Sequence, residues 1–174
     1  YTPATLNFDQ MPYNWNTLYS DVRACNVFIK NVSASALDED YKKKRVAEAR
    51  FLRAYFYQSL WMAYGGVPVI TEPLDISVQG DSIFKARSTS DETFTFITTE
   101  LAAAADDLPV TADESGRATK GAALTLKGWV ELYDHQYTAS AASNQQVMDL
   151  GVYSLFPDFG NLFMPAINVN NEGI

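Results

Sequence analysis

One long apolar helix, predicted over residues 39–64, constrains the fold of this chain more than any other feature. From residue 46 onward, apolar side chains recur at steps of three and four along two ridges of the helix. A helix that is apolar on two ridges needs other elements on most of its sides, because an open flank would leave one ridge in water. The first ridge is Val46, Ala49, Leu52, Phe56, Leu60 and Ala63, and the second is Ala47, Phe51, Tyr55 and Met62, with Trp61 beside it. The sequence therefore predicts a mainly α-helical chain with this helix at its centre.

Charged side chains inside this helix predict a buried electrostatic network. Glu48, Arg50 and Arg53 are the only charged residues between Val46 and the end of the helix. A helix covered on most sides must shield some of them, and a buried charge is tolerated only when it is paired. We therefore predict structural ion pairs at these three positions. Gly65-Gly66 is predicted to end the helix.

Four further helices are predicted over residues 14–31, 90–108, 119–138 and 140–150. Asp38 or Asp40 is a candidate cap for the central helix. Thr89 and Glu92 have the spacing of a capping box, and Thr119 is a candidate cap for the helix that follows. The expected inward face of that helix is Ala123, Leu126, Val130, Tyr133 and Tyr137. Gly151 is predicted to end the last helix in the left-handed conformation.

A helix pair occurs twice in the sequence. Shifting the helix 39–64 by 74 positions brings it onto the helix 119–138. The matched residues are Ala49 with Ala123, Leu52 with Leu126, Arg53 with Lys127, Ala54 with Gly128, Tyr55 with Trp129 and Phe56 with Val130. Paired antiparallel helices with small residues at their contacts are typical of tetratricopeptide repeats. We therefore expect tetratricopeptide-like helix pairs, joined by irregular connectors.

Composition narrows the classes of function. A net charge of -8 over 174 residues argues against nucleic acid, whose phosphates would be repelled. The single cysteine, Cys25, excludes an internal disulfide. The lone His135 lies inside the predicted helix 119–138, and its neighbour Asp134 points away from it, so the two form no catalytic relay. We expect no catalytic residue, no cofactor and no metal site.

Aromatic and amide side chains ahead of the first helix are the best candidates for ligand binding. Tyr13, Asn14 and Trp15 lie together there. Sugar rings present apolar C–H faces that stack on Trp and Tyr, while amides bond their hydroxyl groups. The alternative is that Trp15 begins the core face of the first helix and that Tyr13 packs on the same helix.

Three motifs in register resemble the SusD/RagB family. The first runs from Glu48 to Tyr55 and continues in Tyr64-Gly65-Gly66-Val67-Pro68-Val69. The second runs from Gly116 to Leu124 and on to Leu132-Tyr133. The third comprises Trp15, Tyr19, Cys25-Asn26 and Ile29. Members of that family are surface glycan- and nutrient-binding lipoproteins of Bacteroidetes, and they are built on tetratricopeptide-like helix pairs.

The resemblance implies a function without catalysis. Such a protein captures oligosaccharide at the outer membrane and delivers it to a TonB-dependent SusC-like transporter, with a lipid anchor in the full-length protein. Family members are longer, so we expect residues 1–174 to be a single helical portion of a larger SusD-like protein. Some ligand contacts of the family lie in loops ahead of the first helix. Two alternatives stay open, a tetratricopeptide-type scaffold that binds other proteins and a glycan-cleaving enzyme.

Overall fold

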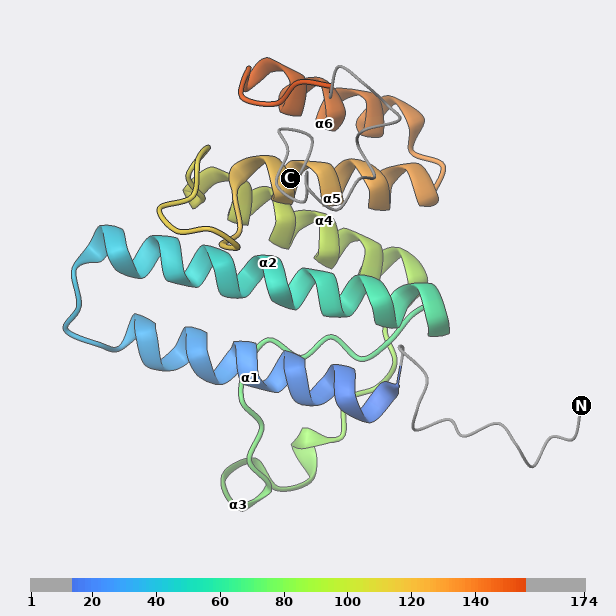
Figure 1. Ribbon diagram of the computed structural model, residues 1–174. Helices are drawn as coiled ribbons and strands as arrows, with labels where there is room; N and C mark the ends of the chain where they lie inside the picture. Colours follow the sequence, from blue (N-terminus) through green and yellow to red (C-terminus); the bar gives the residue numbers. More distant parts are fainter. Residues whose placement is uncertain (1–13, 156–174) are drawn as a thin grey trace, which may run out of the picture.

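The computed structural model describes residues 14–155, and within them it is a stack of α-helices without any strand (Figure 1). The long helices are α1 (Trp15–Ser33), α2 (Glu39–Tyr64), α4 (Ser90–Asp107), α5 (Lys120–Tyr133) and α6 (Tyr137–Asp149). The connector between α2 and α4 carries the short helix α3 (Ile76–Gln79) and a 3-10 turn, Gly80–Ile83. The prediction of a mainly α fold is confirmed.

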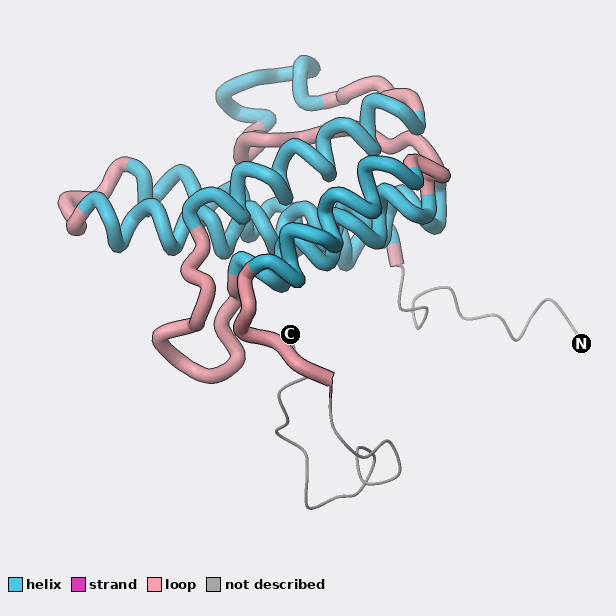
Figure 2. Tube along the Cα trace, turned by 90° about the horizontal axis from the view of Figure 1, so that it is seen from above, coloured by secondary structure: helices cyan, strands magenta, loops and turns pink. Residues whose placement is uncertain are grey.

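Each long helix packs on the next one in the chain. α1 packs on α2, α2 on α4, α4 on α5 and α5 on α6, and α2 makes only a small contact with α5. Figure 1 shows this order as successive layers, and Figure 2 shows the same layers from above. The connector runs past α1 to α3, which lies below α1 in the view of Figure 1. The predicted pairing of α1 with α2 and of α4 with α5 is confirmed. This arrangement is that of tetratricopeptide-like helix pairs.

The core consists of two clusters of buried residues, and each draws on both helix pairs. The larger cluster surrounds α2 and contains Leu18, Val22, Ala54, Tyr57, Leu60, Trp61, Val67, Ile97, Leu101 and Val130. A smaller cluster joins the ends of α4, α5 and α6 and contains Ala47, Ala104, Ala105, Leu108, Ala123, Leu124 and Val147. Small side chains dominate the second cluster, so these helices approach closely. Cys25 is a buried residue of α1, and burial raises the pKa of its thiol.

The predicted caps are present. The Asp38 carboxylate accepts from the first backbone N–H groups of α2. Thr89 and Glu92 form the complete capping box of α4, and the Thr119 hydroxyl accepts from the backbone of α5. Gly65 and Gly151 both have positive φ at the ends of their helices.

The predicted helix 119–138 is wrong at its C-terminal end. α5 stops at Tyr133, and α6 starts at Tyr137 rather than at residue 140. Between them His135 takes a left-handed backbone conformation, with φ of 61°. The amphipathic pattern runs through this turn without a Gly or Pro, so periodicity alone does not locate it. Tyr133 and Tyr137, expected on the inward face, are exposed.

Smaller corrections concern the first helix and the central one. α1 continues to Ser33, beyond the predicted end at residue 31. α2 is covered by α1 and α4, but Leu52 and Tyr55 from its two predicted ridges are 45% and 48% exposed. The central helix therefore keeps one open flank.

Candidate functional site

The predicted sugar-binding residues lie at the start of α1. Tyr13 is outside the described residues. Asn14 is the N-cap of α1, and its Oδ1 accepts from the backbone N–H groups of Asn16 at 2.9 Å and Thr17 at 3.2 Å. The structure therefore assigns the Asn14 side chain a structural role at the helix start.

Trp15 belongs to an aromatic cluster at this end of the molecule. Its ring lies 4.8 Å from that of Tyr19 and 5.1 Å, edge to face, from that of Tyr64 at the end of α2. Trp15 is only partly buried, and Tyr64 is exposed. The Tyr19 hydroxyl donates to the carbonyl of Pro68 at 2.7 Å, and burial raises its pKa. The structure thus adds Tyr64 to the residues found by sequence reasoning.

Arg53 forms a buried ion pair between α2 and α4. It is 5% exposed, and its Nε donates to Oε2 of Glu100 on α4 at 3.0 Å. A second bond, from Nη2 of Arg53, reaches the same carboxylate oxygen. Arg50 donates to the other oxygen of Glu100 at 2.9 and 3.2 Å. Glu100 therefore bridges two arginines of α2.

Asn26 extends this network to α1 and the connector. Its Oδ1 accepts from Nη1 of Arg53 at 2.7 Å. Its Nδ2 donates to the carbonyl of Ile70 at 3.0 Å. One buried group of polar side chains thus ties together α1, α2, α4 and the segment that leaves α2. A satisfied network of this kind fixes the position of the connector.

Glu48 belongs to a separate cluster near the surface. It accepts from Arg45, one turn earlier on α2, and from Nε of Arg117 at 2.8 Å, just ahead of α5. Burial raises the pKa of Glu48, an effect that the neighbouring Arg45 only partly offsets. The three charges predicted as structural ion pairs therefore fall into two clusters, and only Arg53 among them is fully buried.

Tyr57 gives the connector a pH-dependent anchor. Its hydroxyl accepts from the backbone N–H of Ile70 at 2.7 Å, and burial raises its pKa to about 12. An unfolded tyrosine ionises near pH 10. The stabilising contribution of Tyr57 is therefore complete below pH 10 and is lost as the pH rises toward 12, by roughly 2–3 kcal/mol.

We expect chemical denaturation across this pH range to show that fall in stability, and the fall to be smaller in Tyr57→Phe. Tyr41, an exposed tyrosine, provides the control variant Tyr41→Phe. Parallel curves for wild type and Tyr57→Phe between pH 9 and 12 would contradict the assignment.

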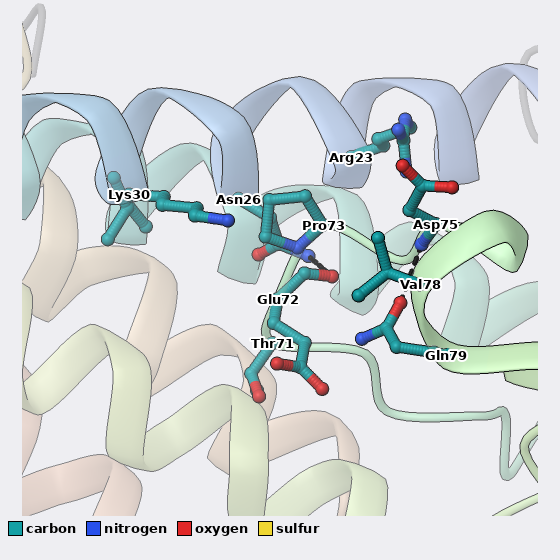
Figure 3. Close-up of a pocket in the computed structure, with 10 residues that line it drawn as sticks. Arg23, Asn26, Lys30, Thr71, Glu72, Pro73, Asp75, Val78 and Gln79 are labelled. Carbon is teal, nitrogen blue, oxygen red and sulfur yellow. Dashed lines mark hydrogen bonds between the residues drawn. The ribbon is translucent and has the colours of Figure 1, made fainter. Parts of the chain in front are cut away.

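A polar hollow of about 490 Å³ lies between α1 and the connector (Figure 3). Lys30 and Glu72 face it, and Asn26 contributes to its lining. Arg23 donates to the carbonyl of Leu74 at 2.5 Å. Asp75 accepts from Ser77, and these bonds lower the pKa of its carboxyl. Three of the lining side chains, those of Arg23, Asn26 and Asp75, are thus engaged in hydrogen bonds that hold the connector between α2 and α4.

A more apolar hollow of about 550 Å³ lies between α1 and α2. Phe28, Tyr41 and Leu52 line it, and all three are exposed. Arg45 and Arg117 line it as well, on either side of Glu48. An exposed apolar surface rimmed by charge is typical of an interaction site.

The described part of the chain contains neither a cluster of metal-ligating side chains nor a membrane-spanning helix. Residues 14–155 contain no group of three or more side chains placed to hold a metal ion. None of their helices is long and apolar enough to cross a membrane.

These features define a class: a scaffold of tetratricopeptide-like helix pairs with an aromatic cluster at one end. Residues 2–132 match a family model described as SusD-like, starch-binding and associating with the outer membrane. The chain therefore belongs to the SusD-like family of carbohydrate-binding proteins.

Individual relatives agree with this assignment. The chain is 26% identical to SusD-like protein P25 of Formosa agariphila over 91% of its own length and 30% of that protein. A crystal structure of a SusD-like protein of Bacteroides fragilis has 38% identity and a TM-score of 0.76, over 81% of this chain and 27% of the other. A laminarin-binding SusD-like protein has 28% identity and a TM-score of 0.76, over 86% and 33%. The chain spans about 30% of the length of the curated relatives.

Proposed function

We propose that this chain is the helical portion, residues 1–174, of a larger cell-surface protein that binds glycans without cleaving them. It delivers oligosaccharides to a TonB-dependent SusC-like transporter in the outer membrane, and a lipid anchor holds the full-length protein there. The observation that carries the proposal is the family match over residues 2–132. The laminarin-binding relative supports a neutral glycan as the ligand.

In this proposal Tyr13, Asn14 and Trp15 are the ligand contacts contributed by this portion. Trp15 and Tyr64 present an aromatic surface where α1 begins and α2 ends. The apolar C–H face of a sugar ring loses water when it stacks on such a surface, and neighbouring amides bond the hydroxyl groups. No charge is neutralised, so the affinity depends little on salt.

The exposed apolar hollow around Phe28 and Leu52 is the proposed surface for the transporter. None of Asn14, Trp15 and Tyr64 lines this hollow, so the proposed glycan and transporter surfaces share no residue. The same hollow favours the alternative function, a tetratricopeptide-type scaffold for protein–protein interaction, because apolar grooves between helices also accept peptides.

Calorimetry on the full-length protein tests the glycan proposal, with laminari-oligosaccharides and malto-oligosaccharides as probes. We expect Tyr13→Ala and Asn14→Ala to weaken binding. Because Asn14 also caps α1, Asn14→Asp serves as a matched control that keeps the cap and removes the amide. Weak binding by both Asn14 variants, at unchanged melting temperature for Asn14→Asp, points to a contact between the amide and the sugar.

Other outcomes separate the alternatives. Unchanged affinity in Tyr13→Ala, Asn14→Ala and Trp15→Ala removes this loop from the site. Release of shorter sugars from either probe contradicts binding without cleavage. Binding of the transporter or of peptides, with no affinity for any glycan tested, favours the protein-interaction scaffold.

A further inference from the structure

We propose that α5 carries a second sugar-stacking platform, formed by Trp129 and Tyr133, which binds the apolar face of a neutral pyranose ring. This inference rests on the proposed glycan-binding function and adds a subsite to it. The platform lies on a different helix from the predicted contacts at Asn14 and Trp15.

The two rings together form a broad exposed surface. Trp129 is 41% exposed and Tyr133 is 49% exposed, and they lie one turn apart on α5. Their ring centroids are 6.1 Å apart, and the ring planes differ by 34°. The two ring planes are thus closer to parallel than to perpendicular, and both rings are exposed. A flat ligand with an apolar face can therefore contact both.

Buried aromatic rings hold this surface in place. The ring of Trp61 on α2 is buried and lies 5.4 Å from that of Tyr133, at 71°. The indole Nε1 of Trp61 donates to the hydroxyl of Ser90 at 2.8 Å, and its ring also contacts Phe94. Tyr133 thus rests on a ring that is itself fixed. Rigid aromatic side chains lose little conformational entropy when a ligand binds.

The platform and the aromatic cluster at the start of α1 both contact the last turns of α2. Trp61 supports Tyr133, and Tyr64, three residues later on α2, contacts Trp15. Residues three apart on a helix are neighbours on its surface. Both aromatic surfaces therefore lie near the C-terminal end of α2, and Figure 1 shows this end on the same side of the molecule as the N-terminal end of α1 and the C-terminal end of α5. A long glycan can engage both surfaces, whereas a short one occupies one.

The chemistry of the platform favours a neutral sugar. Its two residues are uncharged, and the chain as a whole carries a net charge of -8, which disfavours anionic ligands. Asp134 and Gln136 follow Tyr133 directly in the loop to α6, where they bond each other at 3.3 Å. They bring a carboxylate and an amide within three residues of the platform, as partners for sugar hydroxyl groups.

Tyr55 on α2 is an exposed aromatic residue that lacks, among the described residues, a neighbouring ring in a similar plane. Tyr55 is the counterpart of Trp129 under the 74-residue shift, and it is exposed to a similar extent. Its ring meets Phe56 at 69°, edge to face. That pair offers no common plane for a sugar ring, so Tyr55→Ala is a control for the loss of an exposed aromatic side chain.

The test compares laminarin with laminaritriose as ligands of the full-length protein. We expect Trp129→Ala to weaken laminarin binding by roughly three- to tenfold, the loss given by removing one aromatic contact. Laminaritriose binding, which the Asn14–Trp15 surface supports alone, stays within about twofold of wild type. Trp129→Phe retains part of the laminarin affinity, and Tyr55→Ala leaves it unchanged. Circular dichroism confirms that each variant is folded.

Three results would overturn the inference. Unchanged laminarin affinity in Trp129→Ala removes the platform and leaves the glycan-binding function standing. Equal losses in Trp129→Ala and Tyr55→Ala show a general effect of surface aromatics instead of a subsite. Absence of binding to both ligands by the wild-type protein, together with absence of binding to malto-oligosaccharides, overturns the proposed function and the platform together.

Discussion

Replacing Arg53 with alanine is expected to lower the free energy of unfolding by about 3–5 kcal/mol, a cost typical of breaking a buried ion pair. The substitution leaves the Glu100 carboxylate buried with only Arg50 as a charged partner. It also removes the donor to Oδ1 of Asn26, so a second buried polar group loses its bond. Urea denaturation of the 174-residue chain measures the loss.

Arg50 and Glu48 provide the controls. The Arg50 side chain is about one-third exposed and bonds one oxygen of Glu100, so Arg50→Ala is expected to cost about 1 kcal/mol. Glu48→Ala removes a cluster near the surface and is also expected to cost less than Arg53→Ala. The double variant Arg53→Leu with Glu100→Leu recovers much of the loss, because it leaves no buried charge unpaired and Arg50, which loses its partner, is partly exposed to water. If Arg53→Ala and Glu48→Ala both leave the free energy of unfolding unchanged, neither the buried network nor the Glu48 cluster has a structural role.

Sequence reasoning located Arg50 and Arg53 of the network without their partners, Glu100 and Asn26. Arg53 stands out because it interrupts an apolar helix. Glu100 has a comparable signal, since it lies between Ile97 and Leu101 on the inward face of α4. Asn26 gives a weaker one, because buried asparagine is compatible with many local bonds. Which of these side chains meet depends on the packing of three helices, and periodicity does not specify that packing.

Some helix boundaries depend on the local sequence, and others depend on tertiary packing. The ends at Asp38, Thr89 and Gly65 depend on capping chemistry within a few residues, and they were predicted correctly. The break at His135 has no such signal. Its left-handed conformation is imposed by the return of α6 onto α5, a tertiary effect that overrides local preference.

The candidate site shows how far residue types alone lead. Aromatic and amide residues ahead of α1 suggested sugar contacts, and the structure places Trp15 in a partly exposed aromatic cluster. Tyr64 and the exposed pair of Trp129 and Tyr133 were not foreseen as binding surfaces, because their exposure depends on how the helices pack. Tyr133 continues the ridge of Ala123 and Val130, which are buried, but it is the last residue of α5 and is exposed.

Gly66→Ala is expected to destabilise the chain by about 3 kcal/mol, at the upper end of the cost of overpacking. A Cβ atom at this position would lie 2.1 Å from the carbonyl oxygen of Ser88, and 2.6 and 2.8 Å from backbone atoms of Thr89 and Ser90. All three obstacles are backbone, so no side-chain rotation relieves them. The contact is close because the chain leaving α2 crosses the start of α4 here, where Val67 donates to Thr93 at 3.2 Å.

Gly80→Ala is the matched control for this substitution. Gly80 has φ of 54° and ψ of -141°, and a Cβ atom there meets nothing within 4 Å, so its cost is limited to the backbone strain of positive φ, about 1–2 kcal/mol. Gly66→Ala has no such strain and differs only in the close approach. A larger loss for Gly66→Ala than for Gly80→Ala in urea denaturation therefore measures the crossing itself, and the reverse order would contradict it. Because the displaced backbone includes the capping box at Thr89, we also expect Gly66→Ala to lose the protection of the first amides of α4 from hydrogen exchange.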